Sequence, residues 1–291
     1  MSNQLKMGIP VKYALAAATS GGSQNFLGAR WVSASLKLVP ASEKRSLALR
    51  YLALSPHYFF RTKANARLST QDFLEFEFHR NQNSRKLITD SLLLKYLEPG
   101  FTCLDYGCGP GFLAQAVAPK VAKVIACDIS GGVLACAKTI NSGRNIDYRQ
   151  IGPNGTVPVA DGAVDLVYSF AVVQHVTDDV FKGILSELRR TLRPSGTVVC
   201  HVVVDGQPGW MPEAQVRADR TVEGRLKWRF GLHGFSRSRE SLEKLVANAG
   251  FKVVQIVPIA DLGVDLAGDD IAGQHLCVFT PEFTAVRLKV K

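Results

Sequence analysis

The chain has 291 residues, of which 46% are hydrophobic and 21% are charged, and its formal net charge at pH 7 is +10. That length and composition exclude collagenous, low-complexity and wholly disordered chains, and they predict a sizeable buried core. No apolar run approaches the ~20 residues that a membrane-spanning helix needs.

Nearly all of the positive charge belongs to the N-terminal part of the chain. Residues 1–71 contain ten Lys and Arg residues against a single acidic residue, Glu43, whereas residues 72–291 contain 25 basic and 24 acidic residues. We therefore interpret residues 1–83 as a basic N-terminal extension, partly helical, and residues 84–291 as the main domain. Nucleic acid, an anionic membrane surface and organellar targeting are alternatives that the charge leaves open.

Three helices are expected before residue 100. Residues 41–54 carry apolar side chains at helical spacing, and Pro56 then stops the helix. A second helix is expected to begin at Ser69, because Ser69 and Asp72 resemble a capping box. A third is expected over residues 84–97, ending at the Pro-Gly pair that follows. The chain before residue 40 shows only weak periodicity and predicts no element.

Alternating strands and helices are expected from residue 101 onwards. Repeated βα units with apolar strands are typical of an α/β fold, here a Rossmann-like, doubly wound, mostly parallel sheet with helices on both faces. Residues 205–237 interrupt the alternation with Trp, Phe, Arg and Lys and form an insertion after the fifth strand. The expected strands are 101–105, 123–128, 146–151, 164–169, 197–204, 251–256 and 276–279, and the expected helices are 111–118, 130–141, 177–193 and 238–248.

The strongest signal is a glycine-rich turn between a strand and a helix, Leu104-Asp-Tyr-Gly-Cys-Gly-Pro-Gly-Phe112. Its three glycines permit a tight turn and let a ligand approach bare backbone, and the following helix directs free N–H groups at that ligand. Asp128 ends the next strand, 21 residues beyond Gly107, where a carboxylate can accept hydrogen bonds from ribose hydroxyls. The dinucleotide fingerprint requires glycine where this chain has Phe112, which disfavours an oxidoreductase.

These residues resemble the class I S-adenosylmethionine-dependent methyltransferases, specifically their small-molecule branch. The segment 105–111 is similar to the first motif of that family, residues 161–169 to its fourth strand, and residues 187–196 to the segment before its fifth strand. Residues 235–251 are similar to its late helix and strand. The resemblance covers about residues 84–257 and implies S-adenosyl-L-methionine as the cofactor.

The resemblance also implies which residues bind the cofactor. The glycines of the first motif would lie against its methionine part, with Asp105 ordering the loop, and residues at the ends of the next strands would hold its nucleoside. The implied set is Asp105, Gly107, Gly109 and Gly111 at the first motif, Asp128 at the ribose, Ile129 and Asn154 at the adenine, and Phe170 as backbone beside the amino group of the cofactor.

His175 is the candidate catalytic residue, because it follows the fourth strand, where acceptor-facing groups are expected. A histidine there could equally orient a loop. His233, in the insertion, is a weaker candidate, and His201 lies in mid-strand and is interpreted as a core histidine. No His or Cys cluster has zinc-ligand spacing, so no metal is expected.

Several absences favour oxygen as the methylated atom. The fourth strand is not followed by the Asn- or Asp-Pro-Pro-aromatic pattern of enzymes that methylate base amino groups, nor by a Cys or a metal-binding carboxylate. We therefore expect O-methylation of a small-molecule, sugar or lipid-linked acceptor, with residues 205–237 either folding over it or forming a surface helix pair.

Two alternatives to that function stay open. The first is an RNA- or membrane-associated methyltransferase that uses the basic arm, and the second is a non-catalytic scaffold that binds the cofactor. The six cysteines lie mostly in apolar runs without a CxxC pair, which predicts buried, reduced thiols in a cytoplasmic protein.

Overall fold

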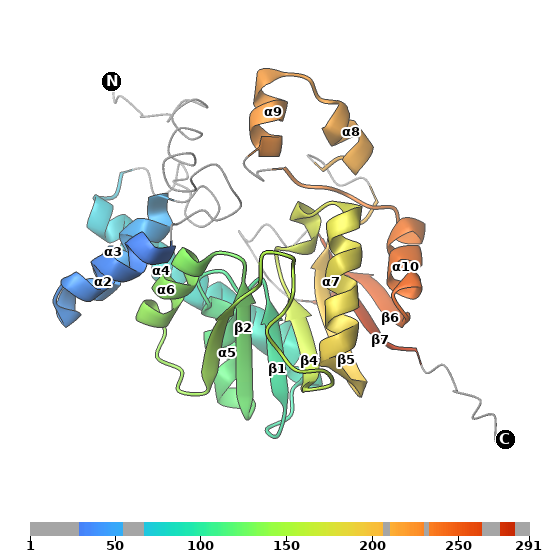
Figure 1. The fold of residues 1–291 in the computed structure, drawn as a ribbon, viewed down its shortest axis with the longest axis horizontal. Helices are drawn as coiled ribbons and strands as arrows, with labels where there is room; N and C mark the ends of the chain where they lie inside the picture. The colour runs from blue at the N-terminus through green and yellow to red at the C-terminus, as the bar shows by residue number, and fades with distance from the viewer. Residues whose placement is uncertain (1–28, 55–66, 206–209, 230–232, 264–273, 283–291) are drawn as a thin grey trace.

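The computed structural model describes residues 29–54, 67–205, 210–229, 233–263 and 274–282 (Figure 1). Within these ranges seven strands form one sheet, in the order β3-β2-β1-β4-β5-β7-β6. The strands are β1 Thr102–Tyr106, β2 Lys123–Asp128, β3 Ile146–Gln150, β4 Val164–Ser169, β5 Leu192–Val202, β6 Phe251–Pro258 and β7 His275–Pro281.

The first five strands pair in parallel, and β7 runs antiparallel to both β5 and β6. The carboxyl ends of β1, β2 and β4 therefore meet at one edge of the sheet. The strand order reverses between β1 and β4, so the loops that leave these two strands begin side by side, the usual position of a ligand crevice in such sheets. The predicted fold class is confirmed.

Helices cover both faces of the sheet (Figure 1). On one face, α7 (Asp178–Thr191) and α10 (Arg239–Asn248) pack their apolar sides on the strands. On the other, α5 (Phe112–Val117) and α6 (Gly131–Ile140) pack in the same way. The N-termini of α6, α7 and α10 lie where the sequence predicts them. Their caps are Ser130, Thr177 and Ser238, and each cap side chain accepts a hydrogen bond from a backbone N–H three residues later.

Three N-terminal helices, α2 (Ala29–Leu38), α3 (Ala41–Leu54) and α4 (Thr70–Ile88), share a further core with α5 and α6. The sequence predicts α3 correctly and misses α2, in which Val32 and Leu36 are the buried side chains among residues 30–38, one turn of periodicity. These helices lie beside α6 in Figure 1, and α2 and α3 both contact it. No helix in the described part of the chain is long and apolar enough to cross a membrane.

A single helical rod replaces the second and third helices that the sequence predicts. It begins at the N-cap Ser69 and continues past α4 through a π-helical turn and a 3-10 turn that ends at Tyr96. The side chains of Asn81 and Thr89 donate hydrogen bonds to carbonyls four residues earlier, so these polar residues bond within the helix instead of ending it. The expected helix start at Ser84 is therefore wrong, and the division between residues 83 and 84 falls inside α4.

Strand β5 begins earlier than predicted. Helix α7 ends at Thr191, and Leu192 already pairs with Val164 of β4. The pairing then resumes at Leu166 and Thr197, so the Pro-Ser-Gly segment expected to end the helix is instead an irregularity within the strand.

Two short helices, α8 (Glu213–Ala218) and α9 (Val222–Arg229), form much of the described part of the insertion (Figure 1). The carboxylate of Glu213 accepts a hydrogen bond from the backbone N–H of Asp178, the first residue of α7 (2.8 Å). The insertion is therefore attached at the edge of the sheet where β4 ends.

Candidate functional site

The glycine loop joins β1 to α5 in a conformation that only glycine adopts freely. Gly107, Gly109 and Gly111 have φ values of +75°, +51° and +76°. The N–H groups of Gly107 and Cys108 donate to the carbonyl of Cys127 in β2 (2.8 and 2.9 Å). These bonds hold the loop against the end of β2, so the residues of the first motif and the residue that ends β2 share one site.

Gly107 also lies against the loop that follows β4. A Cβ atom built on Gly107 would lie 2.3 Å from Cγ2 of Val172, far inside van der Waals contact. The glycine at this position is therefore required by close approach as well as by its positive φ, and it brings the glycine loop next to the segment that carries His175.

We expect Gly107→Ala to lower the free energy of unfolding by about 3 kcal/mol, part from the positive φ and part from the clash with Val172. Gly155→Ala is the matched control, because Gly155 has a φ of +80° and open space around its Cα. Gly155→Ala should lower the free energy of unfolding by about 1 kcal/mol, the cost of the positive φ alone. Urea unfolding measures both losses, and equal losses in the two variants would contradict the packing argument.

Asp128 is the carboxylate that holds the glycine loop in place. Its Oδ2 accepts a hydrogen bond from the N–H of Gly109 and its Oδ1 accepts one from the N–H of Ser130, both at 2.9 Å. Burial raises the pKa of this carboxyl, and the N–H groups of Ser130, Gly109 and Ile129 oppose the rise. The resemblance implies that Asp105 orders this loop. In the structure the N–H of Gly109 bonds to Asp128, and the carboxyl of Asp105 accepts a hydrogen bond from the backbone N–H of Ala114 in the helix that follows the loop.

Asp105 lies beneath the same loop and is only 2% exposed. Its Oδ2 is buried and has no hydrogen-bond partner among the described residues. Burial raises the pKa of this carboxyl well above its usual range, and the charge of Asp128 adds to the rise. A buried acceptor beside bare glycine backbone fits a ligand that brings hydroxyl or ammonium donors, so the residues present suit the expected cofactor.

The three other predicted cofactor residues lie at the same edge but in different settings. Ile129 directly follows β2 and is 42% exposed. Asn154 lies in an exposed turn between β3 and β4, closed by a hydrogen bond from the N–H of Gly155 to the carbonyl of Gly152. Phe170 directly follows β4, is buried and stacks on His201 with 6.0 Å between ring centroids.

His201 supports the loop after β4 from within the core. Its side chain is fully buried, and its Nδ1 accepts a hydrogen bond from the N–H of Ala171 (3.0 Å). Ala171 has a φ of +60°, unusual for a residue other than glycine, and this bond stabilises that conformation. His201 is thus a hydrogen-bonded core histidine, as the sequence analysis interprets it.

His175 lies in the 3-10 turn Val173–His175, next to the insertion. Its Nδ1 is 2.9 Å from the backbone carbonyl of His233. A carbonyl can only accept, so this contact assigns the proton to Nδ1 and the lone pair to Nε2. Desolvation by surrounding residues lowers the pKa of His175, and the bond to His233 opposes that shift. The neutral ring therefore prevails at neutral pH, the state in which a histidine accepts a proton.

Aromatic residues of the insertion contact the two histidines, of which His175 is exposed and His233 half-buried. The ring of Trp210 is 5.8 Å from His175, and the ring of Trp228 stacks on His233 at 4.8 Å. Phe235 lies 4.7 Å from His233 and donates its N–H to the carbonyl of Gln174 (2.7 Å). His233 thus contributes its carbonyl, and the insertion residues are fixed to the turn that carries His175.

Arg237 holds the turn that carries His175, and the sequence does not predict this role. Its buried guanidinium donates to the carbonyls of Val173 and Val176, on either side of His175, and to the carboxylate of Asp178 (3.0, 2.7 and 2.7 Å). It therefore fixes the turn from both ends. Its context, Ser-Arg-Ser-Arg-Glu, is that of a solvated helix start, so no sequence signal marks it as buried.

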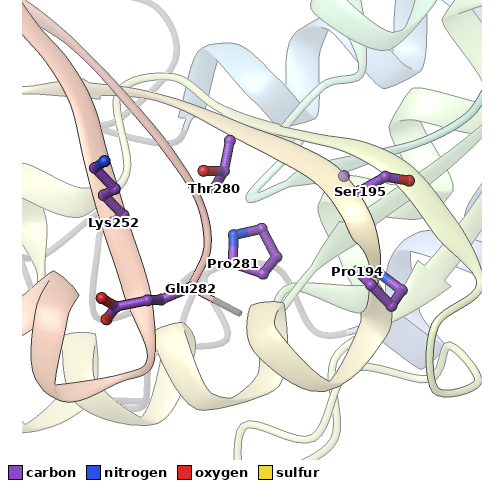
Figure 2. A pocket seen from close by; sticks show the side chains of 7 residues that line it. Pro194, Ser195, Lys252, Thr280, Pro281 and Glu282 are labelled. Carbon is purple, nitrogen blue, oxygen red and sulfur yellow. The ribbon is translucent and has the colours of Figure 1, made fainter. Parts of the chain in front are cut away.

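A surface hollow elsewhere on the molecule is unrelated to this site. Figure 2 shows it lined by residues from the starts of β5 and β6 and the end of β7. That is the opposite edge of the sheet from the glycine loop, because parallel strands begin there. The lining residues are Pro194, Ser195, Gly196, Lys252, Thr280, Pro281 and Glu282.

The sheet order, the glycine loop and the carboxylate at the end of β2 are features typical of α/β folds that bind nucleosides. Residues 104–200 match the model of a family described as a methyltransferase domain. This segment carries the glycine loop, Asp128 and β4, and the match supports the resemblance to the S-adenosyl-L-methionine-dependent methyltransferases that the sequence indicates.

Curated relatives share 30–34% of aligned residues with the chain. A 37.1 kDa protein in transposon TN4556 of Streptomyces fradiae is 34% identical over 63% of this chain and 53% of its own length. A ubiquinone biosynthesis O-methyltransferase of Dinoroseobacter shibae is 31% identical over 53% and 61%. A malonyl-[acyl-carrier protein] O-methyltransferase of Serratia marcescens is 30% identical over 44% and 49%. The chain thus spans about half the length of the curated relatives it matches.

Solved structures share the fold at low sequence identity. A chain in the complex between the Haloferax volcanii Trm112 methyltransferase activator and a methyltransferase has a TM-score of 0.52 at 18% identity, covering 77% of this chain and 100% of that one. The [4+2]-cyclase SpnF has a TM-score of 0.50 at 19% identity, covering 81% and 93%. One of these names describes a cyclase, so the fold alone does not fix the reaction.

Proposed function

We propose that this protein is a methyltransferase that transfers the methyl group of S-adenosyl-L-methionine to a hydroxyl oxygen of a small-molecule, sugar or lipid-linked acceptor. The observation that carries the proposal is the state of His175, whose Nδ1 proton is engaged by a backbone carbonyl and whose Nε2 carries the lone pair. This nitrogen belongs to a loop that lies against Gly107, in the first motif.

When bound, the cofactor supplies a methyl group on a sulfonium, whose transfer to an oxygen nucleophile neutralises the charge. In the proposed site, Asp105, Gly107, Gly109 and Gly111 hold its methionine part, with the Phe170 backbone beside its amino group, while Asp128, Ile129 and Asn154 hold its nucleoside. Asp128 would accept the ribose hydroxyls through the lone pairs left free by Gly109 and Ser130.

His175 accepts the hydroxyl proton at Nε2 as the acceptor oxygen forms its bond to carbon. The imidazolium that results is stabilised by the Nδ1–H bond to the His233 carbonyl. The aromatic side chains of the insertion, with Trp210 beside His175, would provide apolar surface for the acceptor. Two relatives are named as O-methyltransferases, which supports oxygen as the methylated atom.

We place the protein in the cytoplasm, because all six cysteines are free and buried. Burial raises the pKa of several of these thiols, to about 12 in Cys103, Cys127, Cys136 and Cys277. Protonated, buried thiols are inert packing groups, which suits a reducing compartment and excludes them from the reaction.

A screen with labelled methyl donor tests the proposal directly. Phenols, sugars, aliphatic alcohols and carboxylates are offered to the full chain, and transfer of label to a hydroxyl is expected. A carboxylate needs no base, so transfer to carboxylates alone would refute the role of His175 while leaving methyl transfer intact. Binding of the cofactor without transfer to any class would favour the non-catalytic scaffold.

A further inference from the structure

The outward face of α2 is apolar and exposed, although the helix packs on the domain. Val32 and Leu36 point inward into the core shared with α3 and α6. On the outer side Trp31 is 68% and Leu38 is 85% exposed. Positions 31, 34 and 38 share one face of a helix, so Trp31, Ala34 and Leu38 form one apolar stripe. We call these residues, with the two cations described next, the α2 face.

Two unpaired cations border this stripe. Arg30 and Lys37 are exposed, neither forms an ion pair with a described residue, and α2 contains no acidic residue. The only acid of the neighbouring α3 is Glu43, against Lys44, Arg45 and Arg50, and Arg45 alone of these has a described partner, Glu75. The basic charge of the N-terminal region therefore borders an apolar surface.

We infer that the α2 face binds an anionic phospholipid surface. Trp and Leu enter the boundary between headgroups and acyl chains, while flanking Arg and Lys side chains keep their charges at the phosphates. The phosphates of a nucleic acid would bind Arg30 and Lys37, but they would gain nothing from contact with the exposed apolar side chain of Leu38. Protein interfaces favour Trp and Arg but are depleted in Lys, and their apolar centre excludes unpaired charge.

The surrounding structure presents this face as one rigid surface. Tyr51 of α3 donates a hydrogen bond to the hydroxyl of Ser35 (2.7 Å), which in turn donates to the carbonyl of Val32 (2.9 Å). Trp31 and Leu38 are thereby held outward without ordering a flexible segment on binding. The inward side of α2 packs on α6, which anchors the helix to the domain.

Co-sedimentation of the full chain with lipid vesicles tests the inference. The vesicles are pure phosphatidylcholine, or phosphatidylcholine mixed with phosphatidylglycerol. We expect binding to the mixed vesicles only, weakened by salt, with a blue shift of tryptophan fluorescence that is lost in Trp31→Phe. Trp31→Ser with Leu38→Ser, and separately Arg30→Glu with Lys37→Glu, should each reduce binding about tenfold or more.

Matched controls use exposed residues of the same types outside the α2 face. Val222→Ser on α9 and Lys244→Glu on α10 should bind like the parent chain, and thermal unfolding of every variant confirms that it folds. Equal binding of all variants would overturn the inference, and so would absence of binding to mixed vesicles. Salt-sensitive binding to single-stranded RNA, lost in Arg30→Glu with Lys37→Glu, would instead assign the cations to nucleic acid. These outcomes do not depend on methyl transfer, so they test the inference separately from the proposed function.

Discussion

His175→Ala is expected to lower kcat for a hydroxyl acceptor by roughly 10²- to 10⁴-fold, the usual contribution of a positioned general base. Affinity for the cofactor should not change, because the side chain of the loop after β4 that packs on Gly107 is Val172 and not His175. Turnover with the acceptor that the screen identifies measures the first quantity, and calorimetry measures the second. His79→Ala, at an exposed histidine of α4, is the control and should leave kcat unchanged.

Two further measurements separate a base from a residue that only orients its loop. His175→Gln retains a donor for the His233 carbonyl but has no basic nitrogen, so it should be as impaired as the alanine variant; restored activity would mean that His175 acts by positioning. The pH profile gives the second measurement. Desolvation lowers the pKa of His175, so the ring stays neutral down to a pH below its usual value of 6.5. As the pH is lowered, activity should begin to fall only below pH 6.5, where His175 becomes protonated. This acid-side fall in the pH profile should be absent in His175→Gln.

Asp128→Ala is expected to weaken cofactor binding by about 100-fold or more. The change removes the acceptor for the ribose and also the two N–H···O bonds that hold Gly109 and Ser130, each bond to a charged group being worth about 1.5–3 kcal/mol. Calorimetric titration with S-adenosyl-L-methionine measures the loss. Unaltered affinity would remove Asp128 from the proposed site.

Two variants show whether the lost affinity is local. Asp179→Ala replaces an aspartate that is 82% exposed and should not change affinity. Asp128→Asn keeps one carbonyl oxygen but places an NH₂ group opposite one of the two backbone N–H donors, so it should fall between the parent and Asp128→Ala. A loss in Asp128→Asn as small as that in the control would mean that the negative charge and the second oxygen do nothing.

The sequence predicts the sheet and the glycine loop well because both depend on local signals. Apolar runs place β1, β2 and β4, and a hydroxyl side chain before an amphipathic run places the starts of α6, α7 and α10. Asp128, the last residue of β2, is identified by its spacing of 21 residues along the chain from Gly107. These features need no knowledge of what packs against them.

The remainder depends on contacts between distant segments. Helix α2 shows one turn of periodicity, and its position depends on α6, about a hundred residues later. The sequence predicts a new helix from Ser84, whereas α4 continues through this point and the side chain of Asn81 donates a hydrogen bond to the carbonyl of Glu77 within it. Arg237 is identified only when residues 173–178 are brought beside it, because its partners are backbone carbonyls, which have no sequence signature.

The hydrogen bonds of Arg237 connect the insertion, residues 205–237, to the turn that carries the proposed base His175, so these two segments depend on each other. Arg237 ends the insertion, and it is bonded to the carbonyls of Val173 and Val176 and to Asp178. An exchange of acceptor specificity between homologues by grafting residues 205–237 alone would separate that guanidinium from its partners. A graft that carries residues 171–178 together with the insertion keeps them matched, so under the proposed function the smallest transferable specificity unit consists of two segments of the chain.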